Sequence, residues 1–160
     1  MNVEELIQRA RTITEEWLWK TTTELTTPDH LSVWLSTAKD LIPIVAMLRV
    51  QRMGYLAAIT GLDLGTEADE MEALYHFCTG PVTVTLRVKL PRQDPSLPSL
   101  SQIIPSAEPL ERELQEMYGI RINGLRNPAR LYLSDDWPQG VYPMRKDFQP
   151  GEEPVGMEVN

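Results

Sequence analysis

The chain has little of what metal sites and disulfides require. Only one cysteine, Cys78, and two histidines, His30 and His76, occur in its 160 residues. A zinc site draws three or four ligands mainly from these residue types, and an iron–sulfur cluster is normally held by four cysteine thiolates. We therefore expect no metal ligands here. A single cysteine also excludes an internal disulfide and fits a reducing compartment.

The chain also lacks the short motifs that hold phosphates or present a nucleophile. Neither G-x-G-x-x-G nor G-x-x-x-x-G-K-[ST] occurs in it, and no G-x-S-x-G turn is present. These motifs place backbone N–H groups on a phosphate, or a serine at a strained turn. We therefore expect no catalytic residue, no cofactor-binding residue and no cofactor.

Positive charge and long apolar runs are scarce as well. Acidic residues outnumber basic ones 23 to 15, for a net charge of −8, which argues against nucleic-acid binding because that needs clustered Lys and Arg. The longest strongly apolar run, 41–48, is interrupted by Pro43, whereas a spanning helix needs about 20 residues. The N-terminus is acidic where a signal peptide is basic. We expect a soluble chain that meets a membrane only indirectly, through a partner.

The N-terminal third of the chain predicts two helices and a hairpin. Asn2 and Glu5 have capping-box spacing, and an apolar stripe at helical spacing follows them: Leu6, Ala10, Ile13 and Trp17, with Ile7 and Leu18 beside it. The Thr-rich 20–27 segment and the alternating 31–35 segment predict an antiparallel pair. A second helix is expected between Asp40, as its cap, and Gly54.

Three further strands are expected between residues 55 and 90. The apolar run 55–62 predicts a strand buried on both faces, and 71–78 a less cleanly patterned one. The 82–90 segment alternates strictly, so Val84 should point into the core while Thr85 and Arg87 point to solvent. Together these patterns predict an α+β fold, in which helices cover one face of a mostly antiparallel sheet.

Two polar groups in this region have a functional and a structural interpretation. The acidic 63–72 segment could bind a divalent cation, but its spacing matches no known loop, so a solvated turn is favoured. His76 and Cys78 lie on the same side of a strand, yet two ligands make no zinc site. A half-buried histidine and a packed cysteine are the better interpretation.

The C-terminal part is organised differently. A Pro- and Ser-rich loop, 91–105, precedes a helix that Ser106 caps and Gly119 ends. Residues 120–148 then show no sustained period, but they are rich in apolar and aromatic side chains, and five basic against three acidic residues give them a net charge of +2. Such composition suits neither a linker nor a disordered tail. We interpret 1–119 as an α+β domain, 120–148 as an extended partner-binding arm and 149–160 as a flexible tail.

Several motifs in this part resemble one known family. They are Glu111-Arg112-Glu113 with Glu116, Met117-Tyr118 and Gly119-Ile120, followed in order by Arg130-Leu131, Asp135-Asp136-Trp137 and Pro143-Met144-Arg145-Lys146-Asp147. This set resembles the thirty-kilodalton-subunit family, which is the C subunit of the proton-pumping NADH–quinone oxidoreductase, respiratory complex I. The same family occurs in energy-converting membrane-bound hydrogenases and formate hydrogenlyases. The 137–143 segment is more similar to the hydrogenase branch.

The resemblance implies a non-catalytic structural subunit without a cofactor, in the peripheral arm of a membrane-bound, ion-translocating redox complex. Its partners would be the large subunit beside the quinone or nickel–iron site and neighbouring peripheral-arm subunits, on the cytoplasmic side of the membrane. The implied partner interface comprises Glu111, Arg112, Glu113, Tyr118, Arg130, Trp137, Arg145, Lys146 and Asp147. The alternative is a stand-alone α+β ligand-binding domain or small enzyme, which would need a pocket with convergent polar groups.

Overall fold

The computed structural model describes residues 1–15 and 20–151. The elements follow one another as α1 (Val3–Thr14), β1 (Thr22–Thr27), β2 (His30–Leu35), the 3₁₀ helix η1 (Ala38–Asp40), α2 (Leu41–Val50), β3 (Tyr55–Asp63), β4 (Glu70–Thr79), β5 (Val82–Pro91), β6 (Ser96–Pro98), α3 (Ala107–Tyr118) and β7 (Arg121–Asn123). The large sheet has the strand order β1-β2-β5-β4-β3, and β6 pairs with β7 in a separate small sheet.

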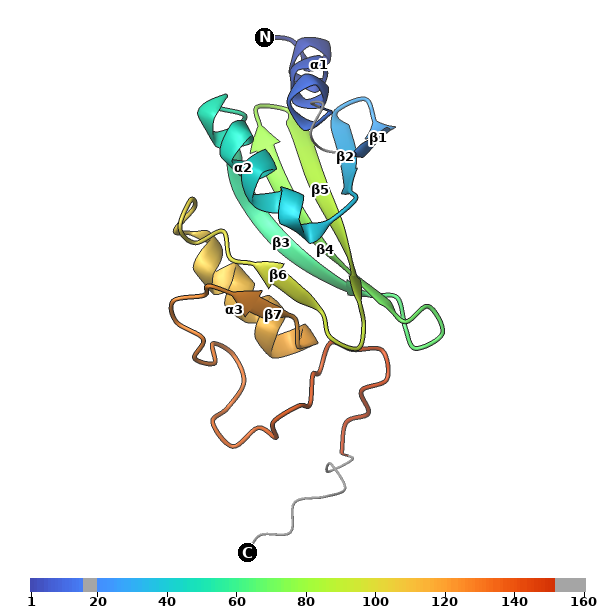
Figure 1. Cartoon of the computed structure of the whole chain (residues 1–160), viewed down its shortest axis with the longest axis vertical. Helices are drawn as coiled ribbons and strands as arrows, with labels where there is room; N and C mark the ends of the chain where they lie inside the picture. Colours follow the sequence, from blue (N-terminus) through green and yellow to red (C-terminus); the bar gives the residue numbers. More distant parts are fainter. Residues whose placement is uncertain (16–19, 152–160) are drawn as a thin grey trace, which may run out of the picture.

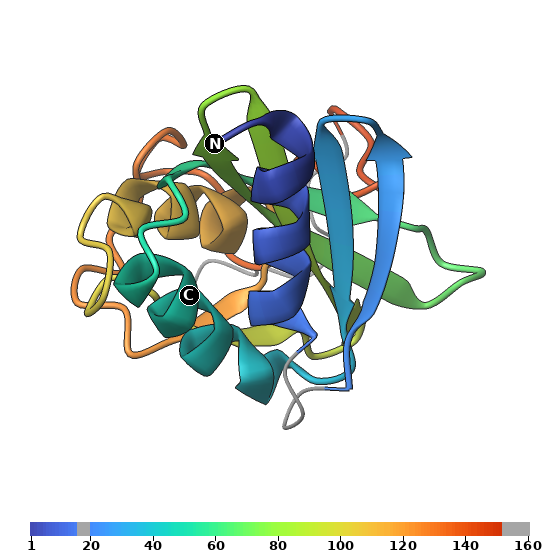
Figure 2. The ribbon, with the colours of Figure 1, turned by 90° about the horizontal axis from the view of Figure 1, so that it is seen from above.

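The large sheet is antiparallel except where β2 lies parallel to β5. Helices α1 and α2 lie over one face of this sheet (Figures 1 and 2). The sheet contributes apolar side chains of β2, β4 and β5 to the core between it and the helices. Among these, Leu31, Tyr75 and Leu86 are fully buried. The predicted α+β fold, with a mostly antiparallel sheet covered on one face, is confirmed. The predicted hairpin is β1–β2.

Helix α1 begins with the predicted capping box. The backbone N–H of Glu5 donates to Asn2 Oδ1 over 2.8 Å, and the backbone N–H of Asn2 donates to the Glu5 carboxylate over 2.9 Å. The predicted stripe faces the core, with Leu6, Ala10 and Ile13 buried. Trp17 and Leu18, which belong to the same predicted stripe, lie outside the described residues.

The second helix starts where predicted, with Asp40 at the N-cap position of α2, but its predicted end and its predicted capping bond are wrong. Asp40 makes no side-chain capping bond, because η1 runs directly into α2 and the Thr37 hydroxyl accepts from the Lys39 N–H instead, over 3.3 Å. The helix ends at Val50 rather than near Gly54. Gly54 has a φ of 79° at the start of β3, where any Cβ would overlap the backbone of Cys78.

The prediction that strand β3 is buried on both faces is wrong. It is an edge strand whose inner side chains, including Leu56 and Ile59, are buried, while Tyr55 is 64% exposed. The register shifts between Leu56 and Ala58, so one extra residue bulges out of the pairing. A bulge interrupts the two-residue alternation of buried and exposed side chains. The sequence of this half-buried strand therefore reads as a continuous apolar run.

The alternation in β5 is confirmed for the core face, where Val84 and its apolar neighbours are buried. The expected exposure of Thr85 is wrong, since only 2% of it is exposed. Thr85 Oγ1 lies 2.8 Å from His30 Nε2 and 2.9 Å from His76 Nδ1. Because β5 has a neighbour on each side, these long side chains cover the hydroxyl. Arg87 is likewise partly covered, lying over the Trp34 ring at 5.0 Å.

The ends of the acidic 63–72 segment are not solvated. Asp63 and Glu72 are buried, and their carboxylates pair with the guanidinium groups of Arg92 and Arg87. Only the middle of the segment forms an exposed turn. No local pattern marks this pairing, because both arginines come from β5 or the residue after it, more than ten residues further along the chain.

The 91–105 loop and the start of the 120–148 segment contain β6 and β7, which were not predicted. The N–H of Ser99 donates to the Asn123 carbonyl and that of Arg121 to the Pro95 carbonyl, each over less than 3 Å. Ile120 and Ile122 are buried beside this small sheet. The 120–148 segment therefore begins inside the folded body. The remaining residues, 124–148, are called the C-terminal arm.

Candidate functional site: helix α3 and the C-terminal arm

Helix α3 is the element to which the rest of the site is attached. Ser106 precedes it without the predicted side-chain cap, and Gly119 ends it in the predicted left-handed conformation, with a φ of 72°. Leu114 points into the core. The other side of the helix presents Arg112 and Glu116 to the arm, four residues apart and therefore on one face.

Glu111, the first residue of the signature motif, points inward and has no exposed surface. Its carboxylate accepts hydrogen bonds from the Ser99 hydroxyl over 2.6 Å and from the Leu100 N–H over 2.5 Å. Burial raises the pKa of the Glu111 carboxyl, and these two hydrogen bonds oppose that rise. Glu111 thus fastens the loop before α3 to the helix, and it offers no surface to a partner.

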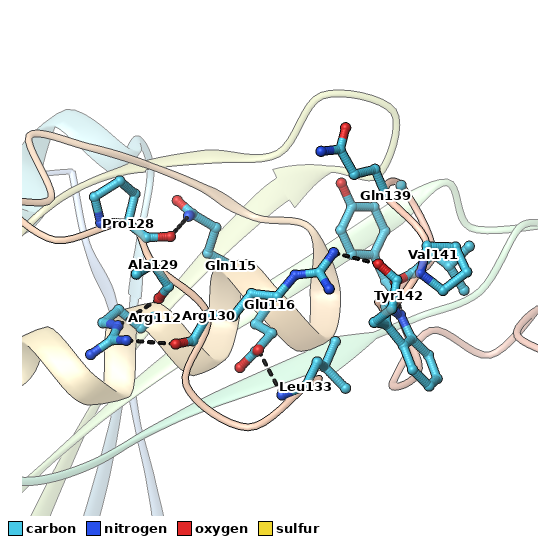
Figure 3. A pocket seen from close by; sticks show the side chains of 13 residues that line it. Arg112, Gln115, Glu116, Pro128, Ala129, Arg130, Leu133, Gln139, Val141 and Tyr142 are labelled. Atoms are coloured by element: carbon cyan, nitrogen blue, oxygen red, sulfur yellow. Dashed lines mark hydrogen bonds between the residues drawn. The ribbon is translucent and has the colours of Figure 1, made fainter. Parts of the chain in front are cut away.

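Arg112 and Glu116 hold the arm by its backbone, as Figure 3 shows. The Arg112 guanidinium donates to the carbonyls of Ala129 and Arg130, each over 2.8 Å. The Glu116 carboxylate accepts from the three successive N–H groups of residues 131–133, over 2.8 to 3.2 Å. A carboxylate among three N–H donors forms charge-assisted hydrogen bonds. This part of the arm is therefore fixed to α3 whatever its side chains are.

Arg130 and Trp137 fold the middle of the arm onto itself. The Arg130 guanidinium donates to the carbonyl of Ser134 over 2.5 Å and to that of Trp137 over 2.6 Å. The indole N–H of Trp137 donates to the Val141 carbonyl over 2.9 Å, and its ring packs against Phe148 with the centroids 6.0 Å apart. The loop between Arg130 and Phe148 is thus closed by side chains of the arm.

The C-terminal end of α3 lies very close to its neighbours, and two glycines make this possible. A Cβ at Gly61 of β3 would stand 2.5 to 2.9 Å from the Tyr118 ring, and one at Gly119 would overlap the Tyr142 ring. Arg145 completes the contact, since its Nε donates to the Tyr118 carbonyl over 2.8 Å and its guanidinium lies over the Tyr142 ring.

The distal end of the arm is clamped to the sheet by a buried ion pair. Arg92 Nε donates to Asp63 over 2.9 Å, and its terminal nitrogen donates to Asp147 over 2.5 Å. The backbone N–H of Lys146 also donates to Asp63, over 2.8 Å. Burial by itself would raise the pKa of Asp63, but these hydrogen bonds and the Arg92 charge lower it to about 2. The carboxylate therefore stays ionised although it is buried.

A cavity of about 350 Å³ lies between α3 and the arm (Figure 3). Three of its charged side chains, Arg112, Glu116 and Arg130, are already hydrogen-bonded to the chain's own backbone. It is lined by Arg112, Gln115, Glu116, Pro128, Ala129, Arg130, Leu133, Trp137, Pro138, Gln139, Gly140, Val141 and Tyr142. The arrangement is suited to fixing the course of the arm.

Seven of the nine predicted interface residues meet in this region: Arg112, Tyr118, Arg130, Trp137, Arg145, Lys146 and Asp147. Glu111 is buried elsewhere, and Glu113 is partly exposed on α3. The predicted set omits Glu116, Asp63 and Arg92, which hold the arm at two points. Glu116 belongs to the family-like motif. The other two carry no periodic signal, because their partners are distant in sequence.

Within residues 1–15 and 20–151, no three His, Cys, Asp or Glu side chains gather closely enough to hold a metal ion. In the same described ranges, no helix is both long and apolar enough to cross a membrane.

Comparison with known proteins identifies the family. Residues 34–154 match the family described as "Respiratory-chain NADH dehydrogenase, 30 Kd subunit". The chain belongs to this family. The match includes α3, the C-terminal arm and all of the sheet except β1 and most of β2, so the resemblance inferred from the sequence motifs is confirmed.

Relatives within the 30 Kd subunit family come from more than one type of complex. The chain is 33% identical to the C subunit of the NADH-quinone oxidoreductase of Nocardioides sp., over 73% of this chain and 48% of that one. It is 37% identical to the C/D subunit of the NADH-quinone oxidoreductase of Phocaeicola vulgatus, over 67% and 20%. It is 33% identical to formate hydrogenlyase subunit 5 of Escherichia coli, over 76% and 22%. The chain thus spans about half or less of the length of these relatives.

Two solved structures share the fold. A chain of the membrane-bound sulfane sulfur reductase, an archaeal respiratory membrane complex, superposes with a TM-score of 0.74 at 21% identity, over 92% of this chain and 85% of that one. The trypsin-resistant fragment of Nqo5, residues 1–134, gives a TM-score of 0.60 at 26% identity, over 79% and 99%. At these identities the first likeness concerns the fold alone.

Proposed function

We propose that this 30 Kd family chain is a non-catalytic subunit in the peripheral arm of a membrane-bound, ion-translocating redox complex. It docks through its C-terminal arm on the large subunit that contains the quinone or nickel–iron site, and it contacts neighbouring peripheral-arm subunits. The complex is either a complex I-like NADH:quinone oxidoreductase or an energy-converting hydrogenase. The docked chain lies on the cytoplasmic side of the membrane.

The observation that carries this proposal is the arrangement of the C-terminal arm. It is irregular, yet α3 holds it at residues 129–133, and Asp63 and Arg92 hold it near residue 147. A segment with so many fixed backbone groups and so little secondary structure is suited to presenting side chains to another chain. Exposed apolar residues on it, such as Tyr132, are typical of a protein interface.

The choice of partner is supported by the relatives. In the Phocaeicola protein a segment like this chain occupies about a fifth of one polypeptide, which is named as a combined C/D subunit. In the Escherichia coli protein it occupies a similar share of formate hydrogenlyase subunit 5. Fusion of two segments in one polypeptide is expected when they function side by side. The two relatives support the complex I and the hydrogenase branch equally.

A ligand-binding role is the second candidate, and the cavity between α3 and the arm is the observation that favours it. The guanidinium groups of Arg112 and Arg130 line this cavity, but both are bound to carbonyls of the arm. A small-molecule site normally offers free convergent polar groups to its ligand. The docking role therefore explains the geometry better.

Native purification tests the proposal. A chain tagged at its N-terminus is isolated with mild detergent from membranes of its source organism, and copurifying subunits are identified by mass spectrometry. We expect a large subunit of the quinone-site or nickel–iron type together with membrane subunits, and these name the branch. A chain truncated after Asn123, which keeps β7, should remain folded and copurify with none of them. Recovery of the full chain alone, with a small molecule bound, would favour the second candidate.

A further inference from the structure

The C-terminal arm turns its backbone towards α3 at two adjacent points. The N–H groups of Leu131 and Tyr132 donate to the Glu116 carboxylate. The N–H of Met144 donates to the Met117 carbonyl over 3.1 Å. Glu116 and Met117 are consecutive residues of α3, so two stretches of the arm that are about twelve residues apart in sequence attach to the same turn of the helix.

The side chains of these attached residues are left exposed. Leu131 is 36% exposed, Tyr132 is 64% exposed and Met144 is 55% exposed. They are three of the nine large hydrophobic residues that the described part of the chain exposes. Isolated exposed apolar residues are common, but three attached to one helical turn are not explained by the fold of the chain itself.

Arg130, Trp137 and Arg145, which belong to the interface predicted from the sequence, are used differently. The Arg130 guanidinium and the indole N–H of Trp137 bind carbonyls of the arm, and the Arg145 guanidinium binds the Tyr118 carbonyl. The hydrogen bonds of all three side chains therefore shape the arm.

We infer that Leu131, Tyr132 and Met144 are the anchors that enter the partner, and that Arg130, Trp137 and Arg145 hold the arm in the shape that presents them. The inference rests on the proposed function, since it assigns the contacts within that docking surface. The partner surface should offer apolar pockets for the leucine and methionine side chains. It should also offer a hydrogen-bond acceptor or donor near the tyrosine hydroxyl, because a buried tyrosine hydroxyl needs a partner.

The chain offers a matched control for the central anchor. Tyr55 is exposed to the same 64% as Tyr132, but it lies on edge strand β3 at the end opposite Asp63, which binds the arm. The probe is the large subunit of the complex from the source organism, co-purified with or titrated against the full-length protein. We expect Tyr132→Ala to weaken binding at least about tenfold, and Leu131→Ala or Met144→Ala to weaken it several-fold. Tyr55→Ala should leave binding within about twofold of wild type.

A second measurement separates anchors from residues that shape the arm. Hydrogen exchange of the 131–133 amides, followed in the free protein, should be unchanged in Tyr132→Ala because Glu116 still holds the backbone. Trp137→Ala should accelerate exchange in the arm and weaken binding together. Equal binding by Tyr132→Ala and wild type would overturn the inference while leaving the proposed function intact. Absence of binding by the wild-type chain would overturn both.

Discussion

The buried Asp63–Arg92 pair allows a quantitative prediction. Asp63 accepts hydrogen bonds from Arg92, from the N–H of Lys146 and from the N–H of Gly65, and only 3% of it is exposed. Replacing it by Asn keeps one oxygen acceptor but places a neutral amide against the guanidinium. Breaking a buried ion pair from one side costs about 3–5 kcal/mol. Asp147 still neutralises Arg92, so we expect the lower part of that range.

The pKa of Asp63 gives an independent value for the contribution of this carboxylate to stability. Its fall from 3.8 to about 2 corresponds to roughly 2.5 kcal/mol of folding free energy at neutral pH. Because the folded-state pKa is the lower one, this contribution is fully present above pH 3.8 and is lost as pH falls through about 2. The stability difference between wild type and Asp63→Asn should therefore be about 2.5–3 kcal/mol at pH 7 and shrink towards pH 2.

Urea unfolding of both proteins between pH 7 and pH 2 measures this difference. Asp147→Asn is the matched control, because its side chain is 51% exposed and it pairs with the same arginine. An exposed pair is worth at most about 1 kcal/mol, so the control should cost clearly less than Asp63→Asn. If the two variants cost the same, or if the Asp63→Asn deficit were independent of pH, the argument from burial would be refuted.

Three further outcomes are expected. Glu116→Ala should accelerate exchange of the 131–133 amides by about ten- to a hundredfold, because three N–H groups lose their acceptor, whereas Glu113→Ala should not. Glu111→Gln should be at least as stable as wild type at about pH 8 in urea unfolding. Burial raises the pKa of the wild-type carboxyl above its ordinary 4.5, so wild type loses stability as pH rises beyond that value and the variant does not. Gly61→Ala should lower Tm by several degrees in a thermal melt, at a cost of about 1–3 kcal/mol, since its Cβ would press on the Tyr118 ring.

Elements with a regular period could be predicted from the sequence. The core face of β5 could be predicted because the alternation of Val84 with its neighbours is a local property of the sequence. The capping box of α1 could be predicted for the same reason, from the spacing of Asn2 and Glu5. The edge position of β3 could not be predicted, because a single bulged residue interrupts the alternation of its buried and exposed side chains. The parallel pairing of β2 with β5 and the three-residue strands β6 and β7 depend on contacts between distant segments.

The place of the candidate site is visible in the sequence, but its bonds are not. Motif resemblance leads to α3 and the arm, and composition suggests that the arm lies against something. Glu116 and Arg112, however, recognise N–H and carbonyl groups that nearly every residue carries. No sequence pattern in the arm marks which backbone groups will be used. For the same reason the sequence does not indicate that Arg130 and Trp137, which are predicted to bind a partner, also donate hydrogen bonds to carbonyls of the arm.

This mode of attachment has a consequence for how the chain can change over evolutionary time. Side chains of α3 form hydrogen bonds with main-chain atoms of residues 129–133. Substitutions at exposed positions such as Leu131 and Tyr132 therefore leave these hydrogen bonds in place. Selection can therefore change the side chains with which the arm makes contacts without changing the path of its backbone. One lineage can alter the side chains it presents, and so adapt to a diverging partner, without first rebuilding the fold that presents them.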